Sequence, residues 1–280
     1  MKVIDISEIE HFNAASIANS GQVFRAEIKG GGIHFISGCE YAIVEEDKIL
    51  STNDLYFENY FDLAADLYGK GDVDFSYKEI QKTILLNTDI LQACDGVRIL
   101  RGNFVETVIS FIISANNSIK RIKGSIDLLC KRYGKRLNFR GHEYFGFPLL
   151  ERLEGITVDD WRSLGCGYRS LYLLKTVLML KDISFDELCQ LNNEGLYERL
   201  IRLSGVGDKV ARCIMLFAFH RLDIMPVDRW ILKSAEKFIE SKERTIKGTA
   251  AEMEKYFGRF GGVAQQYIYY YTQFLGRKIE

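Results

Sequence analysis

The sequence predicts an α+β protein in which a small antiparallel β unit, on the N-terminal side, packs on a larger helical region. Apolar and polar residues alternate on both sides of the glycines at 30–32, which predicts two short strands joined by a glycine turn. From Asp54 onward the apolar residues recur with helical spacing instead. We therefore expect residues 1–95 to form a β-rich unit with short helices, and residues 96–280 to be helical throughout.

Local signals predict the individual elements. Residues 40–52 continue the strand pattern, with a polar turn at Glu46 and Asp47. Asn103 is a natural N-cap for the run FVETVISFIISA, which is apolar on nearly all sides and so predicts a buried central helix. Thr157 and Asp160, three residues apart, predict a capping box at the start of another helix.

The composition is ordinary for a soluble globular chain, because 47% of the 280 residues are hydrophobic and 27% are charged. No apolar run follows a basic start, and none approaches the roughly 20 residues that span a bilayer, so we expect a cytoplasmic protein without a membrane partner. The six cysteines are scattered, with no C-x-x-C pair. This spacing predicts reduced thiols and argues against an iron–sulfur cluster or a cysteine-bound metal.

The charge is distributed unevenly, although the formal net charge is only -1. Residues 41–95 contain 12 Asp/Glu and 4 Lys/Arg, whereas residues 96–140 contain 10 Lys/Arg and 2 Asp/Glu. A local basic surface of this kind is sufficient to bind phosphates. On charge alone, a solvated helix surface explains the basic run equally well.

The stretch from Leu200 to Trp230 combines a glycine hairpin with two candidate chemical groups. Gly205 and Gly207 allow a tight turn, and the amides that follow can point at a phosphate. Lys209 lies in the first turn of the next helix, where the helix dipole disfavours its protonated form, so we expect a lowered pKa suited to a nucleophile. Asp228 follows Pro226 and can act on the same centre as Lys209.

Each of these features also has an ordinary structural explanation. The glycines can be a plain left-handed helix cap, and the lysine a solvated surface residue. The aspartate can be a helix N-cap and nothing more. Their combination on one segment is what favours chemistry over structure.

The segment LSGVGDKVA followed by PVD resembles the helix-hairpin-helix and Gly/Pro-Asp signature of base-excision DNA glycosylases. The interval of 19 residues between Lys209 and Asp228 agrees with that signature, and the lysine is the mark of a bifunctional glycosylase/AP lyase. Four further segments are similar to motifs of the eukaryote-type 8-oxoguanine DNA glycosylase family, in the same order: NSGQVFRA, FIISANNSIKRIKG, LGCGYRSLYL and VAQQYIYY.

The resemblance implies a fold, an activity and a set of partners. The N-terminal unit would be TBP-like, and the helical region would form two subdomains with a DNA cleft between them. The protein would be a nucleoid-associated monomer that excises 8-oxoguanine from duplex DNA, preferably opposite cytosine, through a lysine Schiff base and β-elimination. It would need no cofactor, although the backbone carbonyls of Leu203 and Val206 would be positioned to hold a structural monovalent cation.

The resemblance also implies a role for individual residues. Lys209 would attack the sugar C1′ and Asp228 would stabilise the charge that develops there. The damaged base would be recognised by the Gly21 carbonyl and the Gln265 side chain, and sandwiched between Cys213 and Tyr269. Without the resemblance, Cys213 is a buried core thiol and Tyr269 one of several packing aromatics.

A second group of residues would contact the DNA outside the base pocket. By resemblance, the cytosine left behind is contacted by Asn116, Arg121 and Arg169, the gap in the stack is filled by Tyr168, and phosphate is contacted by Gly205 and Gly207. Trp230 departs from the family, which often has a histidine at that place. Two alternatives stay open: a glycosylase for another oxidised or alkylated base, and a non-catalytic helix-hairpin-helix module that only binds DNA.

Overall fold

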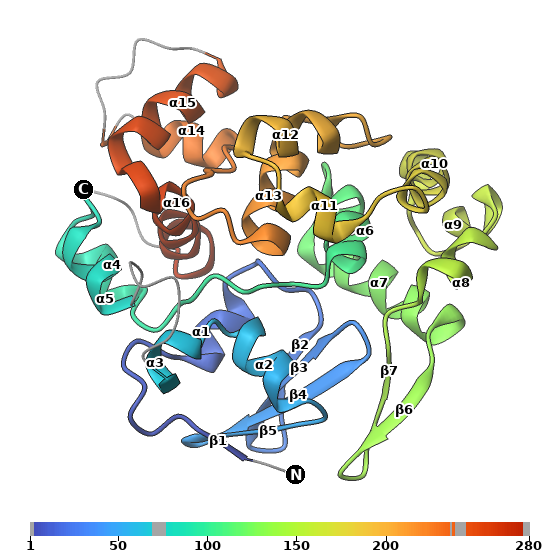
Figure 1. Cartoon of the computed structure of the whole chain (residues 1–280), viewed down its shortest axis with the longest axis horizontal. Coiled ribbons are helices and arrows are strands. Elements are labelled where there is room, and N and C mark those ends of the chain that lie inside the picture. Colours follow the sequence, from blue (N-terminus) through green and yellow to red (C-terminus); the bar gives the residue numbers. More distant parts are fainter. Residues whose placement is uncertain (1–2, 69–76, 236, 239–244, 277–280) are drawn as a thin grey trace.

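A five-stranded antiparallel sheet forms the N-terminal unit of the computed structural model, which describes residues 3–68, 77–235, 237–238 and 245–276 (Figure 1). The strand order is β1 (Val3–Asp5), β5 (Lys48–Ser51), β4 (Glu40–Glu45), β3 (Gly32–Ser37) and β2 (Ala26–Lys29). The strands predicted around the glycine turn and across residues 40–52 are confirmed. Strand β1 was not expected; it pairs with β5 through Val3 opposite Leu50.

One face of this sheet is covered by α1 (Ala14–Asn19) and α2 (Asp54–Tyr60), with α3 (Ala64–Tyr68) beside them. Phe35 of β3 and Ile49 of β5 are completely buried, and they pack with Ile17, Phe57 and Phe61 in a separate small core. The helix start of α2 is capped by Asn53, whose side chain accepts from the Tyr56 amide. The N-terminal unit therefore has a hydrophobic core of its own.

The larger core is helical and is organised around α6 (Phe104–Ser114) and α13 (Asp208–Phe219), which pack against each other. Asn103 caps α6 as predicted, and the Phe111 and Phe217 rings stack at 5.4 Å across the two helices. The capping box of Thr157 and Asp160 is also confirmed. The other helices of this region are α4 (Tyr77–Thr83), α5 (Thr88–Ala93), α7 (Ile119–Tyr133), α8 (Leu150–Glu154), α9 (Val158–Ser163), α10 (Ser170–Leu180), α11 (Phe185–Cys189), α12 (Asn193–Ile201), α14 (Arg229–Ala235), α15 (Ile246–Phe257) and α16 (Gly261–Tyr269).

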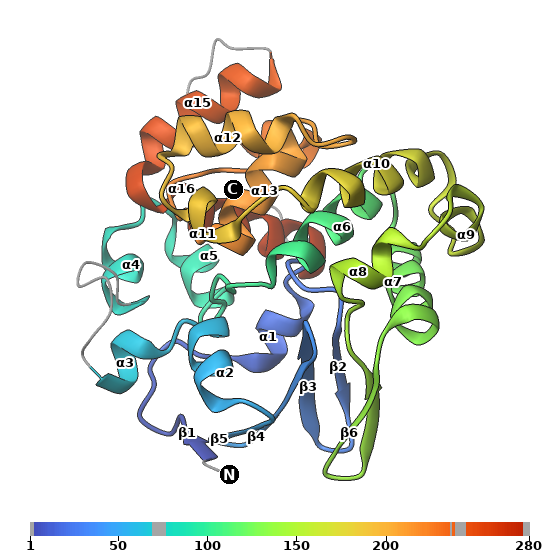
Figure 2. The ribbon, with the colours of Figure 1, turned by 45° about the vertical axis from the view of Figure 1, so that its right-hand side comes forward.

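The expectation that residues 96–280 are helical throughout is wrong at one place. A β-hairpin, β6 (Arg136–Phe139) and β7 (His142–Phe145), follows α7 and lies beside the sheet in Figures 1 and 2. Arg140 and Gly141 form its two-residue turn, with φ of 51° and 82°, which is the conformation that tight hairpins require. Tyr144 and Phe139 pack on Tyr41 of the sheet. These tertiary contacts stabilise the hairpin, whose sequence is too polar to be predicted as a pair of strands.

The packing of α4 and α5 is relevant to the predicted end of the N-terminal unit at residue 95. Tyr77, Ile80 and Ile90, from α4 and α5, are buried in the larger helical core and not in the core of the sheet. The boundary at residue 95 stays a prediction, but these helices pack with the region that follows it. Within the described part of the chain, no helix has both the length and the hydropathy that crossing a membrane requires.

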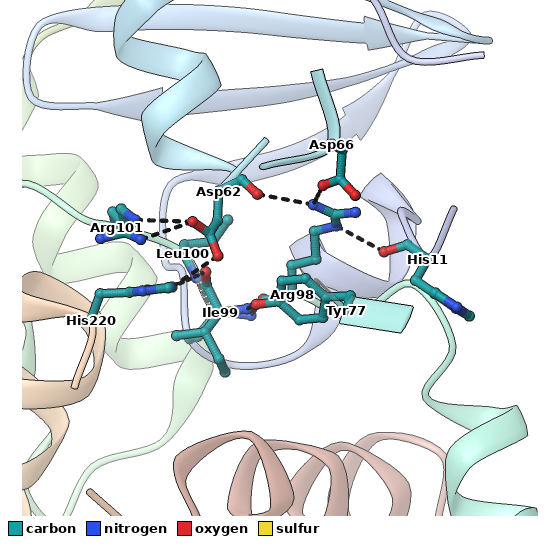
Figure 3. A network of polar contacts seen from close by, with 10 residues as sticks. His11, Asp62, Asp66, Tyr77, Arg98, Ile99, Leu100, Arg101 and His220 are labelled. Carbon is teal, nitrogen blue, oxygen red and sulfur yellow. Dashed lines mark hydrogen bonds and ion pairs between the residues drawn. The ribbon is translucent and has the colours of Figure 1, made fainter. Parts of the chain in front are cut away.

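The segment that leads into α6 is fastened to the N-terminal unit by a polar network (Figure 3). The buried Arg98 guanidinium donates to the carbonyls of Glu10, His11 and Asp62 and to the Asp66 carboxylate, which lies 2.7 Å away. Asp62 also accepts from Arg101 at 2.9 Å and lies 3.4 Å from His220, at the end of α13. This network couples the sheet unit to the helix that carries Lys209.

Candidate active site

A cavity of about 110 Å³ lies between the start of α13, the end of α16 and the segment that follows α1. Six of the residues singled out from the sequence line it together: Gly21, Lys209, Cys213, Asp228, Gln265 and Tyr269. Figures 1 and 2 both show why this is feasible, because α1 lies between the sheet and the helical part, with α13 and α16 beyond it. The fold thus brings together residues from both ends of the chain.

The glycine hairpin sets the position of Lys209. Gly205 has a φ of 81°, and a Cβ there would lie 2.7 Å from the Tyr172 side chain, so only glycine fits. Gly207 is extended and is the N-cap of α13, which places Lys209 in the first turn. Its Nζ donates to Asp228 Oδ2 at 3.2 Å, and its side chain is 53% exposed.

Asp228 has two functions at the start of α14. Its Oδ1 accepts from the Ile231 amide at 3.1 Å and its carbonyl accepts from the Leu232 amide, so it is the helix N-cap that the sequence predicts. Its Oδ2 faces Lys209. The cap fixes the carboxylate, and the fixed carboxylate then holds the lysine at the mouth of the cavity.

The expectation of a lowered pKa for Lys209 is wrong for the free protein. Burial is the largest influence and acts to lower the pKa of Lys209, but the groups facing the ammonium, the Cys213 sulfur and the Asp228 carboxylate, raise it above its ordinary value. At neutral pH the Asp228 carboxylate is the negatively charged group of the two, and its attraction for the ammonium opposes the effect of burial on the pKa. Lys209 is therefore protonated at neutral pH until something in the cavity changes its surroundings.

Cys213 and Tyr269 both form part of the cavity wall. Cys213, one turn after Lys209, is only 4% exposed, and burial raises the pKa of its thiol to about 12, so it is a neutral group at neutral pH. Burial also raises the pKa of Tyr269, so its hydroxyl is neutral. Both side chains are thus uncharged surfaces on which a planar ring can pack.

Gln265 has a buried side-chain oxygen, Oε1, for which the described part of the chain provides no hydrogen-bond donor. An unpaired buried acceptor is costly, so its presence on a cavity wall points to a ligand that donates to it. Gly21 lies on another part of the wall with a φ of 82°, and a Cβ there would be 2.9 Å from both Tyr269 and Phe274. Glycine at this position is therefore required by backbone and by space.

Among the residues predicted to contact DNA outside the cavity, Arg169 contacts both Tyr168 and Asn116. Tyr168, 61% exposed, lies against the Arg169 guanidinium, which is 4.4 Å from its ring centre. Arg169 itself is buried and donates to the carbonyls of Ala115 and, at 2.8 Å, Asn116. Asn116 is exposed in a left-handed turn, and Arg121 is exposed in the first turn of α7. In this state, then, Arg169 holds the loop of Asn116 and does not project from the surface.

The carbonyls of the glycine hairpin are the groups from which the sequence predicts a cation site. The Leu203 carbonyl already accepts from the Val206 amide at 3.1 Å, which leaves it one lone pair for a further ligand. No cluster of three or more His, Cys, Asp or Glu residues suited to a metal occurs in the described residues. The Trp230 side chain lies outside the described residues.

Several cavity residues were not predicted from the sequence. Phe24, Phe111 and Phe217 line it, and in the sequence they are indistinguishable from apolar residues that pack in the core. Gln266 also lines it and is 2% exposed. A second glutamine inside an otherwise apolar and aromatic helix was the one available signal.

Comparisons with known proteins find N-glycosylase/DNA lyases among the relatives of this chain, although no family model matches it. It is 33% identical over 188 residues to the N-glycosylase/DNA lyase OGG1 of Arabidopsis thaliana, covering 62% of this chain and 51% of that protein. It is 35% identical over 156 residues to the N-glycosylase/DNA lyase of Saccharomyces cerevisiae, covering 51% and 42%. The chain thus spans about half the length of these curated relatives or less.

A solved structure matches over nearly the whole length. The 8-oxoguanine glycosylase/lyase of Clostridium acetobutylicum, in complex with double-stranded DNA containing cytosine opposite 8-oxoguanine, superposes with a TM-score of 0.85. The two sequences are 28% identical, and the match covers 99% of each chain. That structure shares the sheet unit as well as the helical region.

Proposed function

We propose that this chain is a member of the 8-oxoguanine glycosylase/lyase family, to which it is similar in sequence and fold, and that it excises 8-oxoguanine from duplex DNA and then cleaves the strand at the abasic site. The observation that carries the proposal is the Lys209–Asp228 pair, 3.2 Å apart, at a cavity that also contains the unpaired Gln265 acceptor. A nucleophilic amine, a carboxylate and a base-sized recess with an unmet hydrogen bond are what this reaction needs.

In the proposed reaction Lys209 Nζ attacks the sugar C1′ after losing its proton. The bond between C1′ and the base breaks, and the base leaves with the bonding electrons and takes up a proton. The carboxylate of Asp228, held by the α14 cap, stabilises the positive charge that develops at the sugar. Opening of the sugar ring and loss of a second amine proton give the Schiff base, and removal of a C2′ proton then expels the 3′ phosphate.

Recognition of the base falls to the residues on the cavity wall. The Gly21 carbonyl accepts from the N7–H that 8-oxoguanine has and guanine lacks. The Gln265 side chain pairs with the edge of the flipped base, which supplies the donor that no described residue gives to its oxygen. Cys213 and Tyr269, both neutral, pack on the two faces of the ring.

The residues that contact DNA outside the cavity rearrange when DNA binds. Tyr168 fills the gap left by the flipped base. Arg169 gives up its hydrogen bonds to the Ala115 and Asn116 carbonyls and contacts the orphaned cytosine instead. The side chains of Asn116 and Arg121 contact the same cytosine. Phosphate approaches the hairpin at Gly205 and Gly207, where the free lone pair of the Leu203 carbonyl and the Val206 carbonyl would suit a monovalent cation. We further propose that the protein acts as a monomer in the cytoplasm, at the nucleoid, without another cofactor.

Borohydride trapping on a duplex containing 8-oxoguanine tests the proposal directly. The parent protein should form a covalent complex and release 8-oxoguanine faster when cytosine is opposite than when any other base is. The Lys209→Gln protein should form none. A parent protein that releases other oxidised or alkylated bases but not 8-oxoguanine would overturn the substrate, and a Lys209→Gln protein that still cross-links would overturn the nucleophile.

A further inference from the structure

Gln266, the neighbour of Gln265 on α16, reaches across the molecule to the segment that contains Gly21. Its side-chain Nε2 donates to the Ser20 carbonyl at 2.6 Å, and the two residues are 246 positions apart in the chain. Both are almost inaccessible, with Gln266 2% and Ser20 0% exposed. Because this bond is buried, the Ser20 carbonyl has no water to replace it.

The Ser20 carbonyl belongs to the peptide group that joins Ser20 to Gly21. Gly21 is in the left-handed region, with a φ of 82°, and glycine rotates more freely than any other residue. A hydrogen bond on the preceding carbonyl therefore fixes the peptide plane on one side of Gly21. Without it, the Gly21 carbonyl could turn away from the direction it has in the folded protein.

The other side of Gly21 is held by Gln22. Its Nε2 donates to the Ser20 hydroxyl and to the Arg98 carbonyl, each at 2.8 Å, and its Oε1 accepts from the Leu100 amide at 2.9 Å. This side chain anchors Gly21 to the segment before α6, whereas Gln266 anchors it to α16. Among the described residues, it is the Gln266 bond that joins the peptide before Gly21 to the helix that carries Gln265 and Tyr269.

We propose that Gln266 is a positioning residue for lesion recognition: by holding the Ser20 carbonyl, it sets the direction of the Gly21 carbonyl relative to Gln265 on the same cavity. The inference rests on the proposed function, because it assigns Gln266 to the discrimination of 8-oxoguanine from guanine. In this role Gln266 acts through the peptide before Gly21: it aligns the Gly21 carbonyl with the Gln265 side chain, and both residues line the cavity.

The test compares two single-turnover rates in the Gln266→Met protein, since methionine keeps the length of the side chain but has no donor. Release of 8-oxoguanine should fall about tenfold, the loss expected when one buried hydrogen bond no longer orients a recognition group. Cleavage at a preformed abasic site should not change, because that substrate has no base to read. A loss of both rates together would overturn the proposal, since it would indicate a structural defect.

Two further variants keep the test decisive. Gln81 also donates from its Nε2 to α16, to the Tyr267 hydroxyl at 3.2 Å, but it does not line the cavity, so Gln81→Met should leave both rates unchanged. In Gln266→Glu, a carboxylate repels the Ser20 carbonyl, whereas the protonated acid donates to it. The ratio of base release to abasic-site cleavage should therefore rise toward the parent's ratio as the pH is lowered from 8 to about 5.5, the range in which a buried carboxyl takes up its proton.

The outcomes separate this inference from the proposed function. If the parent protein does not release 8-oxoguanine, the function itself fails. If the parent releases it, but Gln266→Met keeps the parent's ratio of base release to abasic-site cleavage, the function stands and the role of Gln266 is wrong. A Gln266→Glu protein whose ratio does not respond to pH contradicts the role in the same way.

Discussion

Replacing Asp228 by asparagine removes one negative charge and almost nothing else. Asparagine is as good an N-cap as aspartate, so the bond from the Ile231 amide, now 3.1 Å long, should persist and the free energy of unfolding should change by less than about 1 kcal/mol. The interaction with Lys209 Nζ at 3.2 Å loses its charge. The substitution therefore separates the electrostatic role of Asp228 from its role in the helix.

The size of the effect follows from Coulomb's law. A carboxylate about 4 Å from a developing unit positive charge contributes about 4 kcal/mol at the effective dielectric of a protein surface. This energy corresponds to about three orders of magnitude in rate. The Asp228 side chain is 17% and the Lys209 side chain 53% exposed, so solvent screens part of it. We expect base release to slow by about 10²- to 10³-fold.

The assay is single-turnover release of 8-oxoguanine, with thermal unfolding measured on the same proteins. Asp228→Ala is the matched control, because it removes the charge and the cap: its rate should be as low as that of Asp228→Asn, and its stability lower by a further 1 kcal/mol or so. A lower pKa of Lys209 in Asp228→Asn can only help the attack, so it does not explain a loss. An Asp228→Asn protein that keeps more than about a tenth of the parent rate would refute the electrostatic role.

Two other expectations follow from the structure. Arg25 and Glu106 form a buried ion pair, and Arg25 also donates to the Gly38 and Phe145 carbonyls. Arg25→Met should therefore lower the free energy of unfolding in urea by about 3–5 kcal/mol. A decrease of less than about 1 kcal/mol would contradict a stabilising role for this pair. For Lys209 the pKa is raised, so its attraction to Asp228 is fully present below pH 10.5 and lost only as the pH rises through the raised value. Cleavage at an abasic site should therefore accelerate about tenfold per unit from pH 6 to 8 without unfolding, and a flat profile would indicate that substrate binding removes the proton instead.

The sequence predicts those parts of the fold whose signals are local. Alternation around the glycines at 30–32 and the cap at Asn103 each act within a few residues, and both are found where expected. The hairpin of β6 and β7 was missed because charged residues interrupt its pattern and its stability comes from Tyr41, about a hundred residues away. Distant packing of that kind leaves no trace in a local window.

For the candidate site, too, only the local part could be predicted from the sequence. Lys209 and Asp228 stand at two helix starts on one segment, a combination that favours shared chemistry, and their side chains do meet. Gly21 and Gln265 could be assigned only through resemblance, because nothing local shows that they share a cavity. The pKa of Lys209 was predicted in the wrong direction, since the helix dipole is visible in the sequence and the position of the facing carboxylate is not.

The bond between Gln266 and Ser20 closes a loop of 246 residues, and this has a consequence for how the molecule is made. A chain emerging from the ribosome contains Gly21 long before α16 exists, and contacts so far apart in sequence are among the slowest to form. The Lys209–Asp228 pair is complete earlier, since it needs only the hairpin and the start of α14. If the proposed function holds, a nascent chain would thus possess its reactive amine before it acquires the means to choose a base.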